Sequence, residues 1–158
     1  MVNSIILKNA SIIDGSGKEP YLGHVQIIDD KIDSIVNDEN VLITDNAKVI
    51  DLSGKFILPG LIDAHCHISF DEPRSNDELF FHRREGLAAI IAGTNALKVL
   101  QAGVTSFFDA DSLYSVGGDL RDAIESGVIV GPKMAVGGNA LLTSAGGTAG
   151  RLIPDEGK

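Results

Sequence analysis

The chain has 158 residues and a formal net charge of −9, and its composition, 44% hydrophobic and 22% charged, is typical of a globular protein. The acidic balance argues against nucleic acid and anionic membranes as partners, because both are polyanionic surfaces. The absence of tryptophan is a further argument against nucleic acid. The single cysteine excludes an intrachain disulfide, and the N-terminal stretch lacks the pattern of a signal peptide, so we expect a cytoplasmic protein.

Residues 1–58 are predicted to form a small β-domain. β-Branched residues fill the segment 4–14, whose end carries the turn residues Asp14-Gly15-Ser16-Gly17. A hairpin is predicted around Asp29-Asp30, and two more short strands meet at a turn at Ser53-Gly54. Because every connection is short, we expect an antiparallel unit that forms part of a β-sandwich.

From residue 59 the pattern changes to strands that alternate with helices. Apolar strands are predicted at 61–65, 104–110 and 133–138. Ser75 and Glu78 form a capping-box pattern, from which one helix is expected to continue to Ala102, and a second helix is expected over 118–127. Such alternation predicts parallel strands joined by crossover helices, which makes this part of the chain α/β.

Two of the four histidines, His65 and His67, end the apolar stretch LPGLIDAHCH. Residues i and i+2 of a strand point to the same face, so both imidazoles project together. They would lie at the carboxyl end of a parallel strand, where α/β folds place their active sites. The pair could share one divalent metal ion. Alternatively, one histidine is a core residue and the other caps a loop, and the spacing leaves both interpretations open.

Two residues next to the pair can be interpreted from their positions in the strand. Asp63 shares the face of the histidines, and it either orients a ligand histidine or binds backbone amides at the strand end. Cys66 points the other way, toward the predicted helix layer. We interpret it as a buried, inert thiol rather than a metal ligand or a nucleophile.

Other polar residues have less distinctive positions. Asp109 and Asp111 end the second strand of this half and either line the same mouth or cap the next helix, and capping is the favoured interpretation. His24 lies in the β-domain and His82 on the first long helix. We interpret both histidines as ordinary surface or core residues.

The stretch PGLIDAHCH, after a β-rich segment, strongly resembles the amidohydrolase superfamily of metal-dependent hydrolases. NASIIDGSGKEPYLGHVQIIDDKIDSI is similar to the N-terminal strands of that superfamily. LQAGVTSFFDAD, LRDAIESGVIVGPKM and VGGNALLTSAGG are similar to later stretches of its prolidase- and imidazolonepropionase-like branch. The resemblance implies the N-terminal part of a (β/α)8 TIM-type barrel preceded by a small β-sandwich domain. Residues 1–58 would be the sandwich portion and residues 59–158 the first three βα units.

The resemblance also implies an activity, the hydrolysis of amide or cyclic amide C–N bonds in a small-molecule or dipeptide-like substrate. His65 and His67 would bind one or two divalent ions, with zinc expected. Asp63 would orient a ligand histidine without binding the metal itself. The metal would deliver hydroxide to the bond and polarise its carbonyl oxygen. The catalytic aspartate, the bridging lysine or glutamate and the other histidines of the superfamily have no counterpart in the chain, so no catalytic residue is assigned.

A barrel of eight βα units needs about 250 residues. We therefore expect an N-terminal fragment that is inactive alone and that associates with a complementary C-terminal polypeptide, with copies of itself, or with both. The alternatives are a truncated remnant without activity and a metal-binding partner of a complementary chain. Thr148 follows Gly146-Gly147, where the related branch commonly has a histidine, and this departure leaves the substrate open.

Overall fold

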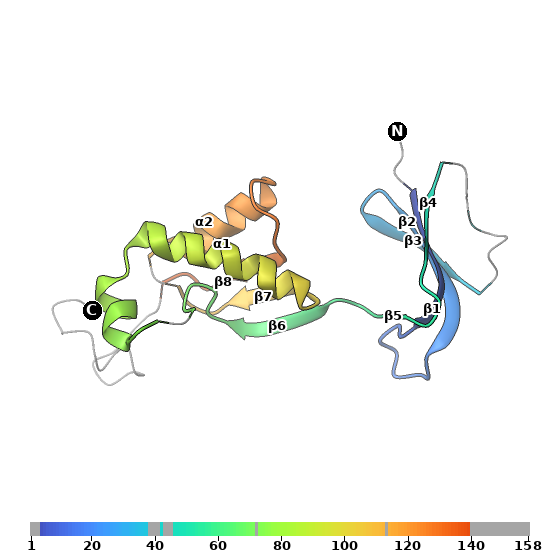
Figure 1. Ribbon diagram of the computed structural model, residues 1–158, viewed down its shortest axis with the longest axis horizontal. Helices are drawn as coiled ribbons and strands as arrows, with labels where there is room; N and C mark the ends of the chain where they lie inside the picture. Colours follow the sequence, from blue (N-terminus) through green and yellow to red (C-terminus); the bar gives the residue numbers. More distant parts are fainter. Residues whose placement is uncertain (1–3, 38–41, 43–45, 72, 113, 140–158) are drawn as a thin grey trace. The chain divides into compact units, whose positions relative to one another are not determined.

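The computed structural model describes residues 4–37, 42, 46–71, 73–112 and 114–139. The chain divides into two compact units, Met1–Pro59 and Gly60–Lys158 (Figure 1). The first unit is built from strands and the second mixes strands with helices, so the predicted α/β class is confirmed. Among the described residues, no helix is both long enough and apolar enough to cross a membrane.

The first unit is one sheet in the order β3-β2-β1-β4, with β5 also paired to β1. Its strands are β1 (Ser4–Ile12), β2 (Tyr21–Ile28), β3 (Lys31–Val36), β4 (Lys48–Asp51) and β5 (Phe56–Ile57). The predicted hairpin joins β2 to β3 in antiparallel register, and Asp29 takes a positive φ of 55° at its turn. Ile6, Ala10 and Val25 lie at its buried centre.

The expectation that this unit is wholly antiparallel is wrong, because β4 and β5 both run parallel to β1. The turn at Ser53-Gly54 therefore closes no hairpin and separates two segments that pair with the same strand. β1 is itself irregular at Asn9, which takes a φ of 62° and donates a side-chain hydrogen bond to Asp51 at 3.1 Å. An alternating apolar pattern marks a strand but is the same for either direction, so it does not predict which partner the strand takes.

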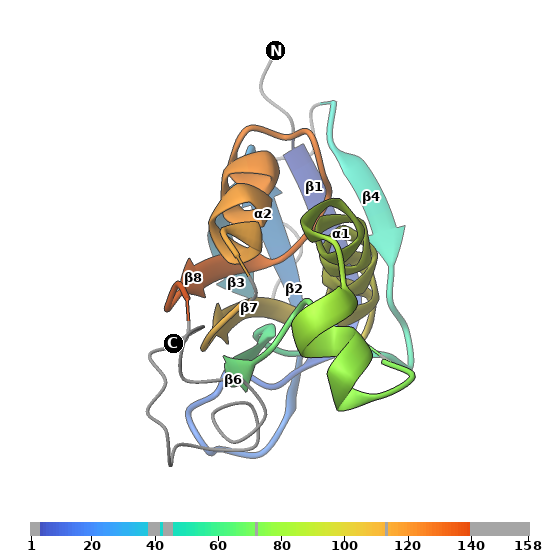
Figure 2. The ribbon, with the colours of Figure 1, turned by 90° about the vertical axis from the view of Figure 1, so that its left-hand side faces the viewer.

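The second unit contains a parallel sheet in the order β6-β7-β8, as the alternation predicts. Its elements are β6 (Leu61–Cys66), α1 (Glu85–Gln101), β7 (Val104–Asp109), α2 (Val116–Glu125) and β8 (Lys133–Val136). Both helices lie on the same face of the sheet (Figures 1 and 2). Each helix ends before a glycine of positive φ, Gly103 at 90° and Gly127 at 76°, because glycine adopts this backbone conformation without steric strain.

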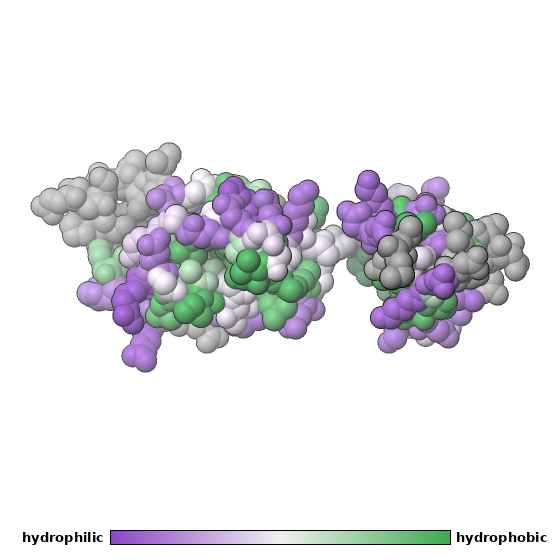
Figure 3. Space-filling view, turned by 90° about the horizontal axis from the view of Figure 1, so that it is seen from above, coloured by the Kyte–Doolittle hydropathy of each residue, from purple (hydrophilic) through white to green (hydrophobic). Residues whose placement is uncertain are grey.

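Small side chains let α1 lie close to the sheet. Ala88, Ala92 and Ala96 are fully buried along one side of the helix and belong to one core cluster with Phe107 of β7 and Met134 of β8. This spacing of four residues places all three alanines on one face of the helix. Hydrophobic residues also reach the surface of this unit, where they lie between hydrophilic patches (Figure 3).

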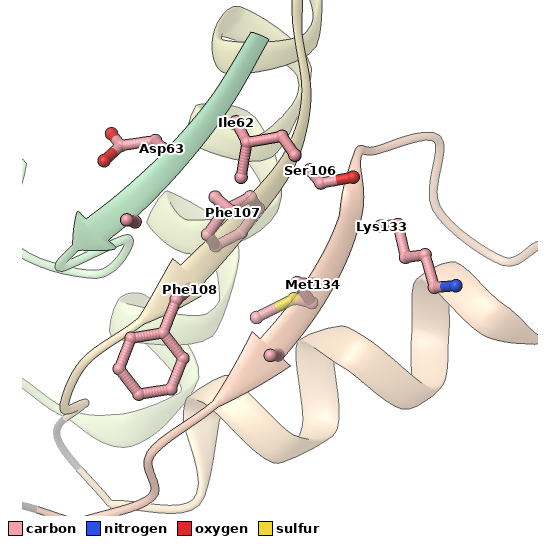
Figure 4. A pocket seen from close by; sticks show the side chains of 9 residues that line it. Ile62, Asp63, Ser106, Phe107, Phe108, Lys133 and Met134 are labelled. Carbon is pink, nitrogen blue, oxygen red and sulfur yellow. The ribbon is translucent and has the colours of Figure 1, made fainter. Parts of the chain in front are cut away.

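The opposite face of the sheet is not covered by any described residue. A hollow of about 350 Å³ lies along it, bordered by all three strands. Figure 4 shows this hollow, with Ile62, Ser106 and Phe108 among the residues that line it. Ile62 is 74% exposed and Phe108 is 38% exposed. Side chains alternate between the two faces of a strand, which is why Phe107 is buried while Phe108 is not.

The helix expected from Ser75 to Ala102 is interrupted, which corrects that prediction. The Ser75 hydroxyl does accept the Glu78 amide hydrogen at 3.0 Å, as a capping box requires. A turn of π-helix, η2 (Glu78–His82), follows, and Arg83 is then extended with a φ of −71° and a ψ of 118°. The helical pattern resumes in α1, so the segment forms two helical pieces.

The interruption coincides with a set of buried contacts made by Arg83, which is extended at this point. Its side chain is 3% exposed and binds both carboxylate oxygens of Glu78, at 3.0 and 2.9 Å. The guanidinium also donates to the carbonyl oxygens of Ser69 at 3.0 Å and Asp71 at 3.4 Å. Arg83 thereby holds the loop that follows β6 in place.

Replacing Arg83 by methionine should lower the free energy of unfolding by about 2–3 kcal/mol, because a buried carbonyl and Glu78 would lose their partner. Urea unfolding measures this loss. Arg121→Met is the matched control, since its pair with Asp122 is exposed, and it should cost less than about 0.5 kcal/mol. Equal losses in the two variants would show that the Arg83 contacts contribute no more than a surface ion pair.

Candidate metal centre

The structure brings His65 and His67 together at the carboxyl end of β6. His65 lies within the strand and His67 directly follows it. Their Nε2 atoms are 3.2 Å apart, and the rings meet edge to face with centroids separated by 5.0 Å. His65 is exposed and His67 is half-buried. Both rings therefore present the same nitrogen to one point in space.

Contacts on the far side of the His67 ring decide which nitrogen is available. Nδ1 lies 2.5 Å from the Asp111 carboxylate Oδ1 and 3.4 Å from the Asp111 carbonyl oxygen. The ring also stacks on Phe70, with centroids 4.9 Å apart and planes within 10°. In a neutral imidazole whose Nδ1 carries the proton, Nε2 has a free lone pair and can bind a metal.

Asp63 makes the backbone contact that was one of its two predicted roles. Its Oδ1 accepts a hydrogen bond from the His65 amide at 3.1 Å. The carboxylate therefore holds the backbone of β6 where the histidine pair begins. This bond fixes the main chain of His65 rather than its ring.

The expectation that Asp109 and Asp111 cap the following helix is wrong. Asp111 lies beside His67, and Asp109 accepts the Ile68 amide hydrogen at 3.1 Å. Asp109 is fully buried, and this burial raises the pKa of its carboxyl group above the usual range. In the first turn of α2, the Gly117 amide hydrogen binds the Ser112 hydroxyl instead, at 3.1 Å.

Cys66 is half-buried rather than fully buried, whereas His24 and His82 are ordinary core and surface residues, as expected. Cys66 packs against the core beneath α1, and its burial raises the pKa of the thiol, with smaller contributions from nearby carboxylates. His24 is buried and accepts the Asn9 amide hydrogen at 3.2 Å. His82 is exposed, 3.1 Å from Asp77.

The histidine pair has the spacing that a metal ion requires. Two imidazole nitrogens on one tetrahedral zinc, each at ~2.0–2.1 Å, lie about 3.3 Å apart. The observed separation of 3.2 Å fits this geometry. No cluster of three or more histidine, cysteine, aspartate or glutamate side chains suited to a metal occurs within the part of the chain that the structure describes. The pair therefore fits as two donors of a larger ligand set, since catalytic zinc takes three protein ligands.

The family comparison covers this same region. The model of the amidohydrolase family matches residues 56–151, more than half of the chain, and its match includes β6 and the histidine pair. The chain belongs to the amidohydrolase family. The membership predicted from PGLIDAHCH is thereby confirmed.

Relatives of this amidohydrolase chain are much longer than the chain itself. It is 32% identical over 143 residues to an ochratoxinase of Aspergillus niger, a match that covers 85% of this chain and 28% of the relative. It is also 34% identical over 83 residues to an imidazolonepropionase of Fusobacterium nucleatum subsp. nucleatum, covering 51% of this chain and 18% of that enzyme. The chain thus spans less than a third of the length of either relative.

A solved structure of a Xaa-Pro dipeptidase with bound methionine in its active site is similar in fold to this amidohydrolase chain. The two superpose with a TM-score of 0.80 at 26% sequence identity, over 91% of this chain and 35% of the dipeptidase. The similarity extends over both units of the chain, although the dipeptidase is again far longer.

Two features of this amidohydrolase site differ from the sequence-based expectation: the ring of Phe70, which had no predicted role, and the carboxylate of Asp111, for which helix capping was favoured. Asp111 lies 44 residues after His67, and only the pairing of β6 with β7 places it there. The predicted parallel strands did indicate that Asp111 lies near His67, because the carboxyl ends of adjacent parallel strands meet at one edge of a sheet. The departure at Thr148 lies outside the described residues.

In metal-free protein, Cys66 should react slowly with iodoacetamide. Its raised pKa means that less thiolate is present at pH 8 than in a free cysteine, so alkylation should be at least about tenfold slower than in urea-unfolded protein. The midpoint of the rate against pH should also lie above that of the unfolded chain. A midpoint at or below that of free cysteine would identify a reactive thiol and contradict the inert role.

Proposed function

We propose that this chain is the N-terminal part of a metal-dependent hydrolase of amide or cyclic amide C–N bonds, in which His65 and His67 bind a divalent cation. The observation that carries the proposal is the convergence of the two Nε2 atoms, 3.2 Å apart, at the carboxyl end of a parallel strand. Membership in the amidohydrolase family supports it. Zinc is the expected cation, with one or two ions bound.

Each residue near the pair has a distinct role in this proposal. His65 and His67 bind the cation through Nε2, and Asp111 keeps the His67 ring in the tautomer that can do so. Asp63 holds the His65 backbone. When bound, the cation supplies Lewis acidity for the attack of water on a carbonyl group. Phe70 limits rotation of the His67 ring by stacking on it.

The substrate in this proposal is a small molecule or a dipeptide-like compound. An imidazolonepropionase and a Xaa-Pro dipeptidase among the relatives support this class. The hollow on the open face of the sheet is lined mainly by apolar side chains, which is typical of the interior of a (β/α)8 barrel. We propose that the three described strands begin such a barrel and that the first unit is part of a β-sandwich.

The proposal includes further βα units that cover the open face of the sheet. Ile62 and Phe108 leave apolar surface exposed there. Among described residues, the outer edges of β6 and β8 also have no strand partner. Unpaired edges and uncovered apolar faces favour association. We propose that a complementary C-terminal polypeptide, or copies of this chain, supply that cover and the remaining ligands.

Substituting either histidine of the pair should strongly weaken metal binding and abolish hydrolysis in the whole protein. His65→Ala and His67→Ala should each weaken zinc affinity by at least about 100-fold, because a zinc site depends on each of its few ligands. Elemental analysis and hydrolysis of a panel of dipeptides, N-acyl amino acids and cyclic amides measure the two effects. His82→Ala, which alters an exposed histidine, is the control.

Other results would favour the alternatives. A whole protein with neither stoichiometric metal nor hydrolysis would be the remnant without activity. An assembly that hydrolyses the panel equally well after both histidines are replaced would make this chain a non-catalytic partner. Loss of zinc in His82→Ala as well would show that the effect is not specific to the pair.

Asp111→Ala should weaken zinc binding by about 10- to 100-fold without abolishing it, because the His67 ring would lose its orienting partner. Isothermal titration with zinc measures the change. Asp77→Ala is a matched control, since Asp77 also faces a histidine, His82, but in an exposed pair away from β6. Unchanged affinity in Asp111→Ala would remove Asp111 from the site.

A further inference from the structure

Asp109 is a buried carboxylate that the proposed site does not use directly. It is the last residue of β7, and none of its surface is exposed to solvent. One carboxylate oxygen, Oδ1, accepts the Ile68 amide hydrogen at 3.1 Å. The other, Oδ2, is buried without a hydrogen-bond partner among the described residues. Burying a carboxylate in this way is costly, so a stabilising or positioning effect must offset it.

The contacts of Asp109 lie next to His67 in the chain. The Cys66 carbonyl oxygen, before His67, accepts the Ala110 amide hydrogen at 2.9 Å. The Ile68 amide, after His67, donates to Asp109. The two peptide planes that flank a residue determine its φ and ψ, and with them the direction of its Cα–Cβ bond. The end of β7 therefore holds both planes, one through the amide of Ala110, which directly follows the strand, and the other through the Asp109 side chain.

A glycine in α2 leaves room for this carboxylate. A Cβ atom built on Gly117 would lie 2.5 Å from Asp109 Oδ2 and 2.9 Å from the Ser112 hydroxyl oxygen. Both separations are shorter than real contacts of a Cβ atom. A Cβ atom built on the next residue, Gly118, meets nothing within 4 Å. Gly117 therefore leaves the space that Asp109 Oδ2 occupies, whereas Gly118 faces no neighbouring atom.

We infer that Asp109 is the positioning residue of the metal centre: its buried carboxylate, admitted by Gly117, sets the direction in which His67 projects. This inference rests on the proposed metal-binding role of the histidine pair. Asp109 acts through the backbone of Ile68 and touches neither imidazole nitrogen directly. Asp111 orients the ring of His67, whereas Asp109 orients the Cα–Cβ bond of the same residue.

The two glycines provide the first test, in which Asp109 itself is unchanged. Gly117→Ala and Gly118→Ala are made in the whole protein, and each is titrated with Co²⁺ alone after removal of bound metal. Gly117→Ala should weaken Co²⁺ affinity by about tenfold and alter the visible spectrum of the bound ion, because the carboxylate is displaced. Gly118→Ala should stay within about twofold of wild type and keep the spectrum.

Substitution of Asp109 itself provides the second test. Asp109→Ala removes the acceptor and should weaken Co²⁺ affinity by about 10- to 100-fold. Asp109→Asn keeps an oxygen at the Oδ1 position and should recover affinity to within about threefold of wild type. Ser112→Ala removes the neighbouring hydrogen bond to Gly117 and should leave the Co²⁺ spectrum unchanged, although its melting temperature falls.

The outcomes separate this inference from the proposed function. If His67→Ala binds Co²⁺ as wild type does, the metal-binding proposal itself fails. If His67→Ala loses Co²⁺ while Asp109→Ala and Gly117→Ala keep wild-type affinity and spectrum, only the positioning role is overturned. If either Asp109→Ala or Gly117→Ala does not fold, the metal affinity and spectrum of the other variant decide whether the positioning role holds. If neither folds, Asp109 is a residue of the folding core and the inference is overturned.

Discussion

The parallel pairing of β6 with β7 is the constraint on which the candidate metal centre depends. The histidine pair lies at the end of β6, and the end of β7 fixes it: the Ala110 amide donates to the Cys66 carbonyl oxygen, and the Asp109 carboxylate accepts from the Ile68 amide. The same pairing brings Asp111 to the His67 ring, because adjacent parallel strands end at one edge of the sheet. A ligand pair on an unpaired strand end would lack this preorganisation.

The helix layer holds the same loop from the other side. Asn95 of α1 donates to the Ile68 carbonyl oxygen at 2.9 Å, and the buried Arg83 donates to the Ser69 carbonyl oxygen at 3.0 Å. α1 can approach closely because it packs on the sheet through alanines. The loop after β6 is thus fixed by polar contacts from β7 and from the helical segment, while the open face of the sheet lies on the opposite side. This arrangement supports the proposal that the site lies at the mouth of a barrel.

Some elements of the fold could be predicted from local sequence signals, and others could not. The helix ends before Gly103 and Gly127 were predictable, because glycine alone adopts a positive φ there without strain. The interruption at Arg83 was not, since it coincides with contacts to a loop 12 to 14 residues earlier, which no local pattern indicates. The parallel direction of β4 and β5 was also missed, because an apolar alternation contains no information about strand direction.

The candidate site likewise contains residues whose arrangement the sequence predicts and residues whose roles it does not. PGLIDAHCH is contiguous, and the period of two in a strand places His65 and His67 on one face, so the family and the convergence of the two histidines could be predicted from the chain alone. The roles of Asp109 and Asp111 could not. An aspartate after a strand can cap a helix, bind a loop amide or face a histidine, and each choice satisfies its local chemistry equally well. Only the packing of β7 between β6 and β8 selects among these roles, because it decides which donor lies within hydrogen-bonding distance of each carboxylate.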